Sequence, residues 1–192
     1  MKIHDQVKTK DMTLSTFKAQ LYGGVAFLVG IPLMVWPFAS IWPVSLNTLT
    51  DQSNASVGLL WFMVAMFAGI LLHELIHGLT AKWIGRLSWR TIKFGVQWST
   101  ITPYCHPTIP ITARAYRLVV VMPLIITGLL PYGFALATGS GWLCALGILF
   151  TLAAAGDMMI LWLMRHLRPN DLVQDHPTKV GLLVVLPIST TQ

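Results

Sequence analysis

Four long apolar stretches restrict the fold of this chain more than any other feature of its sequence. They are each long enough for a helix to cross the hydrocarbon core of a bilayer, which takes about 20 residues. The chain is also 55% hydrophobic and only 10% charged, whereas about a quarter of the residues in a soluble domain are charged. We therefore expect an all-α membrane protein with four transmembrane helices, at residues 21–42, 57–79, 116–137 and 142–164.

The positions of the Lys and Arg residues indicate an orientation in the membrane. All of them lie before the first helix, between or beside the second and third, or after the fourth, and loops 43–56 and 138–141 contain none. Because Lys and Arg are retained on the cytoplasmic side, we expect both termini, the loop 80–115 and the tail 165–192 to be cytoplasmic. The net charge of +6 then requires no nucleic-acid partner. We expect one membrane domain, residues 1–192, in the cell membrane.

Two segments outside the apolar stretches have the composition of β-strands. Residues 91–104 are rich in β-branched and aromatic side chains and alternate partly with period 2, which predicts a small β-hairpin in the loop between the second and third helices. Residues 180–186 are too short to span a bilayer and are rich in valine, which favours a short C-terminal strand. We expect that this strand could pair with the loop strands.

The second apolar stretch contains the motif His73-Glu74-Leu75-Ile76-His77. On a helix, residues four apart lie one above the other on the same face, so the two imidazoles can bind one zinc ion. Zinc lowers the pKa of water to about 7, and an adjacent carboxylate can act as the general base. The motif therefore predicts His73 and His77 as zinc ligands and Glu74 as the catalytic residue of a metallopeptidase.

Glu74 is the only glutamate in the chain, and it lies within an apolar run. An ionisable group at the centre of a membrane costs at least about 2.5 kcal/mol on insertion scales, which favours a functional role. The competing structural interpretation is a polar helix end, with Glu74 extended toward the membrane surface and the histidines packed against other helices.

Asp157 is the other acidic residue within a predicted transmembrane helix, and a catalytic zinc usually has three protein ligands. The second and fourth helices cross the membrane in the same direction. His73 lies 16 residues after Val57 and Asp157 lies 15 after Trp142, so both should lie ~22–24 Å below the same surface at 1.5 Å per residue. We expect Asp157 to be the third ligand, with Gly156 allowing a close approach between helices.

Other arrangements of the site remain open from the sequence. Asp157 could instead orient the histidines by hydrogen bonds, as outer partners of metal-bound histidines usually do. His106, in the loop after the second helix, is the alternative third ligand, and Cys105 beside it is a possible soft ligand.

These motifs resemble those of known membrane metallopeptidases. His73 to His77 with a distant intramembrane aspartate resembles the site-2 protease class, although those enzymes usually have Gly where this chain has Met158. A closer resemblance is to a bacterial family of membrane proteins described as putative zincin peptidases. It covers residues from about 55 to 186 and rests on four motifs, His73 to Gly78, Pro103-Tyr104-Cys105, Gly156-Asp157 and Asp175 to Gly181.

The resemblance implies a zinc-dependent endopeptidase embedded in the membrane, with Zn²⁺ as cofactor. Its substrates would be membrane or membrane-adjacent proteins, including transmembrane segments, which the loop strands could hold extended by β-addition. The alternative is a non-catalytic zinc-binding scaffold or pseudo-protease that binds a membrane partner. The sequence does not determine an oligomeric state.

Overall fold

The third and fourth apolar stretches fold into helical segments that are interrupted, whereas the first and second fold into continuous helices. A computed structural model describes residues 9–43, 55–98, 102–176 and 179–186. In it, four helical spans are long and apolar enough to cross a membrane, Phe17–Ile41, Gly58–Trp83, Ala113–Thr138 and Gly141–His166. The four helices predicted from the sequence are thus present, each within a few residues of its expected bounds.

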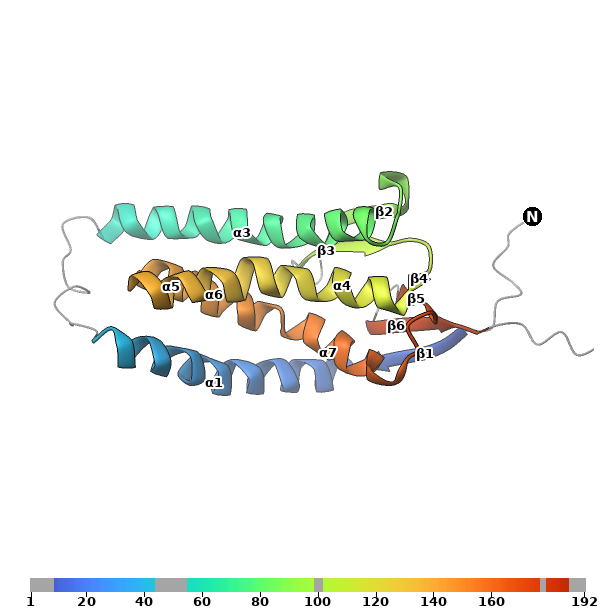
Figure 1. The fold of residues 1–192 in the computed structure, drawn as a ribbon, viewed down its shortest axis with the longest axis horizontal. Coiled ribbons are helices and arrows are strands. Elements are labelled where there is room, and N and C mark those ends of the chain that lie inside the picture. The colour runs from blue at the N-terminus through green and yellow to red at the C-terminus, as the bar shows by residue number, and fades with distance from the viewer. Residues whose placement is uncertain (1–8, 44–54, 99–101, 177–178, 187–192) are drawn as a thin grey trace, which may run out of the picture.

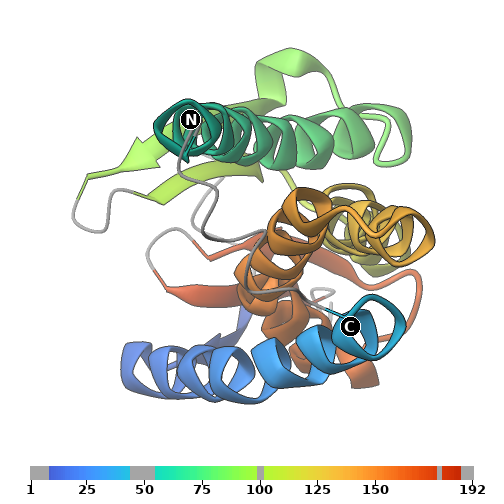
Figure 2. The same cartoon turned by 90° about the vertical axis from the view of Figure 1, so that its left-hand side faces the viewer.

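The helices form a bundle in which α6 and α7 occupy the centre. Helix α3 (Ala55–Trp83) lies on one side against α4 (Ala113–Pro123), and α1 (Thr16–Ile41) lies on the other side against α6 (Gly141–Ala153) and α7 (Ala155–Leu163) (Figures 1 and 2). The α6–α7 span therefore contacts helices on both sides of the bundle.

The backbone is irregular in the middle of the third and fourth spans. In the third, α4 passes into a π-helix, η4 (Leu124–Leu129), and then into α5 (Leu130–Thr138). In the fourth, α6 ends at Ala154, whose φ of −72° and ψ of 7° are not helical, and α7 begins directly after it. Both irregularities lie near the level of the histidines of α3, and π-helical turns are frequent at functional sites.

The predicted hairpin is present and folds back along α3. Strands β2 (Ile92–Gln97) and β3 (Thr102–Pro107) pair antiparallel after a short 3₁₀ turn, η3 (Trp89–Thr91) (Figure 1). A Cβ on Gly78 of α3 would clash with the ring of Phe94. Gly78 therefore allows the hairpin to pack directly on the helix surface, beside the predicted zinc motif.

The C-terminal segment forms a strand, but its predicted pairing with the loop strands is wrong. Strand β6 (Val180–Val185) pairs instead with β1 (Thr9–Leu14) and β5 (Leu172–Asp175), and β5 pairs with β4 (Ile111–Thr112). The result is an antiparallel sheet of order β1-β6-β5-β4. The strands of this sheet adjoin the helix ends at one end of the bundle. There, β1 and β5 are the nearest partners for β6.

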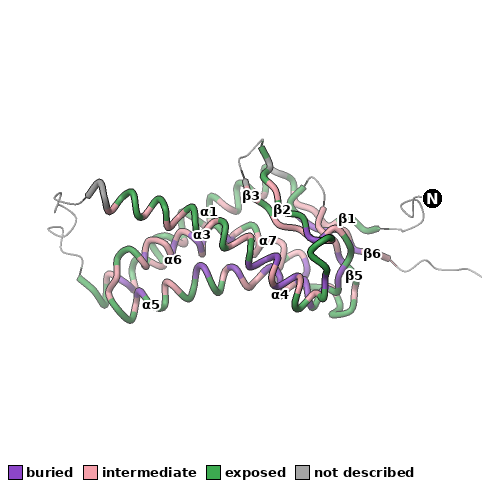
Figure 3. Tube along the Cα trace, turned by 90° about the horizontal axis from the view of Figure 1, so that it is seen from above, coloured by how far each residue is buried: buried purple, intermediate pink, exposed green. Residues whose placement is uncertain are grey.

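Buried apolar side chains form two clusters at opposite ends of the molecule. The sheet-end cluster joins the sheet and hairpin to α4 and contains, among others, Ala81, Tyr116, Val119, Met164, Val173 and Leu182. The far-end cluster lies among α1, α5 and α6 and consists of Phe38, Ala135, Cys144, Ile148 and Leu152. Most of the buried positions gather toward the sheet, whereas α1 and the start of α3 are largely exposed (Figure 3). Exposed apolar helix surface of this kind is what a bilayer would cover.

Candidate metal centre

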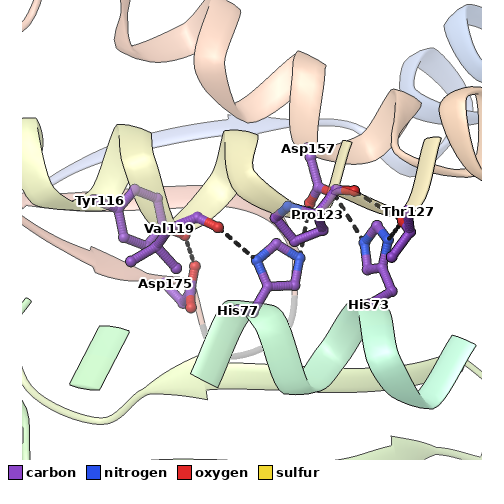
Figure 4. Close-up of polar contacts among 8 residues, drawn as sticks. All are labelled: His73, His77, Tyr116, Val119, Pro123, Thr127, Asp157 and Asp175. Carbon is purple, nitrogen blue, oxygen red and sulfur yellow. Dashed lines mark hydrogen bonds and ion pairs between the residues drawn. The ribbon is translucent and has the colours of Figure 1, made fainter. Parts of the chain in front are cut away.

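His73, His77 and Asp157 meet between α3 and α7. The Nε2 atom of His73 lies 3.2 Å from Oδ2 of Asp157, and Nε2 of His77 lies 3.6 Å from its Oδ1. One ligand atom from each of the three residues lies within 4.8 Å of the other two. Both imidazoles point from successive turns of α3 toward the one carboxylate (Figure 4). The equal membrane depth calculated for His73 and Asp157 is consistent with this contact.

Each histidine is held on its other ring nitrogen by a group of the third span. Nδ1 of His77 lies 2.9 Å from the carbonyl oxygen of Val119, which can only accept, so this nitrogen carries the proton. Nδ1 of His73 lies 3.4 Å from the hydroxyl of Thr127, which itself donates to the carbonyl of Pro123 at 2.8 Å. A neutral imidazole protonated at Nδ1 has a free lone pair on Nε2. Nε2 of both rings faces Asp157, the position from which each lone pair would bind a metal ion.

The break between α6 and α7 explains how an aspartate is accommodated at this depth. Because α7 begins at Ala155, Asp157 lies in its first turn. The unpaired N–H groups and the dipole of a helix N-terminus stabilise a negative charge there. The sequence predicted Asp157 on a continuous helix, so this contribution to its charge was not anticipated.

Glu74 lies in the same cavity, and the backbone of the hairpin holds its carboxylate. The N–H of Cys105 on β3 donates a hydrogen bond to it. A carboxylate has two oxygens, so one can remain available to water in the cavity. The hairpin therefore contacts the residue predicted as general base.

The register of the hairpin shows why this N–H is available. Thr108 N–H donates to the carbonyl of Thr91 at 2.8 Å, and paired positions in an antiparallel ladder alternate between bonded and non-bonded. Cys105 therefore belongs to a non-bonded pair, with its N–H directed away from β2. Pro103 and Pro107 have the same orientation and no N–H. On the described part of this edge, Cys105 supplies the one backbone donor.

The cavity has a volume of about 270 Å³ and is lined by all four predicted site residues and by β3. Gly156 also lines it. A Cβ on Gly156 would meet no atom within 4 Å, so the expectation that this glycine allows a close helix approach is wrong. Its missing side chain instead leaves space inside the cavity, next to Asp157.

His106 and Cys105 lie outside the group of potential ligands found among the described residues. The ring of His106 stacks on that of Tyr104, with their centroids 4.9 Å apart. Burial lowers the pKa of His106, as does the nearby charge of Lys93. Burial raises the pKa of the Cys105 thiol to about 12, and this side chain packs against the sheet-end cluster. A neutral, packed thiol is a poor metal ligand because the thiolate is the binding form.

The structure adds two polar residues to the cavity that were not identified from the sequence as part of the site. Tyr116 of α4 donates a hydrogen bond from its hydroxyl to the carboxyl group of Asp175 at the end of β5, and both line the cavity (Figure 4). Burial raises the pKa of Asp175 to about 7, against the opposing effect of His77. The sequence indicates Asp175 only through a family resemblance, because no spacing rule connects a tail residue to a site within the apolar helices.

The donor set fits a zinc ion. Two imidazole nitrogens and one carboxylate oxygen are a set found in catalytic zinc sites, which keep a further position for water or substrate. The hydrogen bonds made by the Nδ1 atoms of both histidines also match those of metal-bound imidazoles. His73, His77 and Asp157 are the residues that would hold the metal.

Comparison with known proteins bears on the same part of the chain. A protein-family model described as "Putative zincin peptidase" matches residues 66–172, which include the histidine motif, the hairpin and Asp157. No curated protein and no solved structure matches the chain. The tail motif from Asp175 to Gly181, which the sequence resemblance included, lies beyond the matched residues. The match spans more than half of the chain, and the chain therefore belongs to the putative zincin peptidase family.

Proposed function

We propose that this protein is a zinc-dependent endopeptidase embedded in the cytoplasmic membrane. The observation that carries this proposal is the meeting of His73, His77 and Asp157 in one buried group, with Glu74 in the same cavity. Membership in the zincin peptidase family supports the reaction class. The four apolar helices support the location.

The three ligands, Glu74 and the Cys105 backbone each have a role in this reaction. A zinc ion held by the three ligands would acidify a water molecule and polarise the peptide carbonyl. Glu74 accepts a proton from the attacking water and returns it to the leaving amine as the C–N bond breaks, so that one water is consumed for each peptide bond. The Cys105 N–H holds one Glu74 oxygen in place during both transfers.

The distribution of Lys and Arg supports a cytoplasmic location for both termini, for the hairpin loop and for the four-stranded sheet. The cavity is lined by β3 and by Asp175 of the sheet, so it lies toward the end of the bundle that carries these strands. Water and substrate would then reach the site from the cytoplasmic side.

The hairpin supports a substrate that is held in an extended form beside the metal. The edge of β3 directed away from β2 presents carbonyl groups at Pro103, Cys105 and Pro107, and its one N–H is already bonded to Glu74. A peptide at this edge would therefore be held through its own N–H groups, which leaves its carbonyls free for the reaction. Membrane or membrane-adjacent proteins, including unwound transmembrane segments, are the substrates that we propose, as in the site-2 protease class that the motifs resemble.

The test is the comparison of Glu74→Gln with the wild-type protein in cells. Protein N-termini in the membrane fraction are profiled by mass spectrometry, with Asp11→Asn, a half-exposed acid outside the cavity, as the matched control. Wild type and Asp11→Asn should produce N-termini that Glu74→Gln lacks, while zinc content remains equal in all three. Identical N-termini in all three would support the alternative, a zinc-binding scaffold or pseudo-protease with a membrane partner.

A further inference from the structure

Pro123 lies in the third membrane span, next to the residues that hold the two histidines (Figure 4). In an α-helix, the N–H of residue i bonds to the carbonyl of residue i−4. Position 123 would therefore donate to the carbonyl of Val119, but proline has no N–H. The following N–H, from Leu124, bonds to Val121 rather than to Val119. The Val119 carbonyl is thus left without the partner that a regular helix would provide.

The imidazole of His77 supplies that partner from the neighbouring helix. Its Nδ1 lies 2.9 Å from the Val119 carbonyl oxygen, and both residues are buried. A carbonyl without a partner is costly inside a membrane, so this bond is favourable for the helix as well as for the histidine. It also fixes a proton on Nδ1 of His77, which leaves Nε2 as the nitrogen that faces Asp157.

The backbone after Pro123 holds the second histidine in a related way. The carbonyl of Pro123 accepts the hydroxyl of Thr127, and the Thr127 oxygen lies 3.4 Å from Nδ1 of His73. Thr127 lies within the π-helical segment, where the regular ladder is interrupted. Two irregularities of one span therefore face the two imidazoles.

We propose that Pro123 is a positioning residue of the metal centre, which acts by leaving the Val119 carbonyl free to bind Nδ1–H of His77. The inference rests on the proposed zinc site, although the hydrogen bond itself does not require a metal. Replacing Pro123 with alanine would supply an N–H that competes with His77 for the same carbonyl. The helix would become more regular, while the histidine would lose the group that selects its tautomer.

The test compares Pro123→Ala with Pro131→Ala, which removes another proline of the same span, in the first turn of α5. In zinc-free protein in detergent, ¹⁵N NMR of the histidine rings should show His77 protonated at Nδ1 in wild type and Pro131→Ala, and a mixture of tautomers in Pro123→Ala. Zinc affinity, measured by competition with a chelator, should fall about 10–100-fold in Pro123→Ala alone, the usual cost of losing an outer partner. Circular dichroism and thermal melting show whether each variant is folded.

Two results would overturn the proposal. One is a Pro123→Ala protein that keeps the single tautomer and the zinc affinity of wild type. The other is an equal loss in both proline variants, which would indicate a general effect of helix geometry. If the wild-type protein bound no zinc, the proposed function would fail, but the tautomer comparison in zinc-free protein would still decide the role of Pro123.

Discussion

The far end and the middle of the helical bundle are stabilised in different ways. At the far end, the buried cluster of Phe38, Ala135, Cys144, Ile148 and Leu152 lies among regular helical segments whose buried side chains are apolar. In the middle of the bundle, the third span is π-helical, the fourth is broken, and polar groups are buried between them. The difference indicates that regular helices are sufficient to form the bundle. The irregular backbone is confined to the level at which polar side chains must be held.

The largest loss of zinc affinity is expected when a proposed metal-ligating side chain is replaced. Asp157→Asn keeps the size of the side chain but removes the charge that faces both imidazoles. We expect zinc affinity to fall by more than about 100-fold, beyond the usual cost of losing an outer partner. Chelator competition measures this effect.

His106→Ala is the matched variant for that measurement, because His106 is the alternative third ligand. It should leave zinc affinity unchanged, since its ring stacks on Tyr104 and lies outside the ligand group among the described residues. A large loss of affinity in His106→Ala, with little change in Asp157→Asn, would reverse the assignment of the third ligand.

An intermediate loss of activity is expected when the hairpin no longer holds Glu74, the proposed general base. Cys105→Pro removes the N–H that binds Glu74 without removing a bond to β2, because position 105 belongs to a non-bonded pair. We expect kcat to fall about 10–100-fold, with KM and zinc content little changed. The kinetics require a peptide substrate found by the N-terminal profiling.

Cys105→Ala is the control, because it removes the thiol and keeps the N–H. Amide hydrogen exchange tests the same bond without an activity assay. Glu74→Ala should speed exchange at the Cys105 N–H. Exchange at Tyr104 and His106 should not change, because their N–H groups face β2. Equal kcat values for Cys105→Pro and Cys105→Ala would show that this bond does not position Glu74.

The smallest effect is expected at the far end. Ile148→Val removes one buried methylene from a purely apolar cluster, which usually costs about 0.5–1.5 kcal/mol of unfolding free energy. Zinc affinity should not change, because no polar group of the centre lies in this cluster. Denaturant unfolding in detergent, followed in parallel with zinc binding, would separate the two properties. A coupled loss of zinc affinity would show that the far-end cluster and the metal centre are not independent.

The sequence was sufficient for the features that depend on local pattern. The length of the apolar stretches predicted the four spans, because a helix must satisfy its own backbone in lipid. The spacing of His73 and His77 placed them on one face, and counting residues placed Asp157 at the same depth. The β-branched and aromatic residues of the loop predicted the hairpin.

Features that depend on contacts between distant segments could not be predicted in the same way. The strand at Val180–Val185 was expected, but its partners β1 and β5 were not, since strand pairing is set by which edges meet in space. Asp175 and Tyr116 belong to segments with no motif in common. Gly156 was assigned to helix packing because its neighbours in space were unknown.

The sequence by itself thus determined what this protein contains: four apolar helices, a two-histidine motif with its glutamate, and one further acid within an apolar stretch. These follow from periodicity, length and the cost of charge in a membrane, which are properties of single segments. The tertiary structure alone showed how the groups are held, with Val119 and Thr127 on the histidines, the first turn of α7 around Asp157, and Cys105 on Glu74. The physical reason is that a hydrogen bond requires both partners at the correct distance and orientation, and only the packed helices and hairpin provide that geometry.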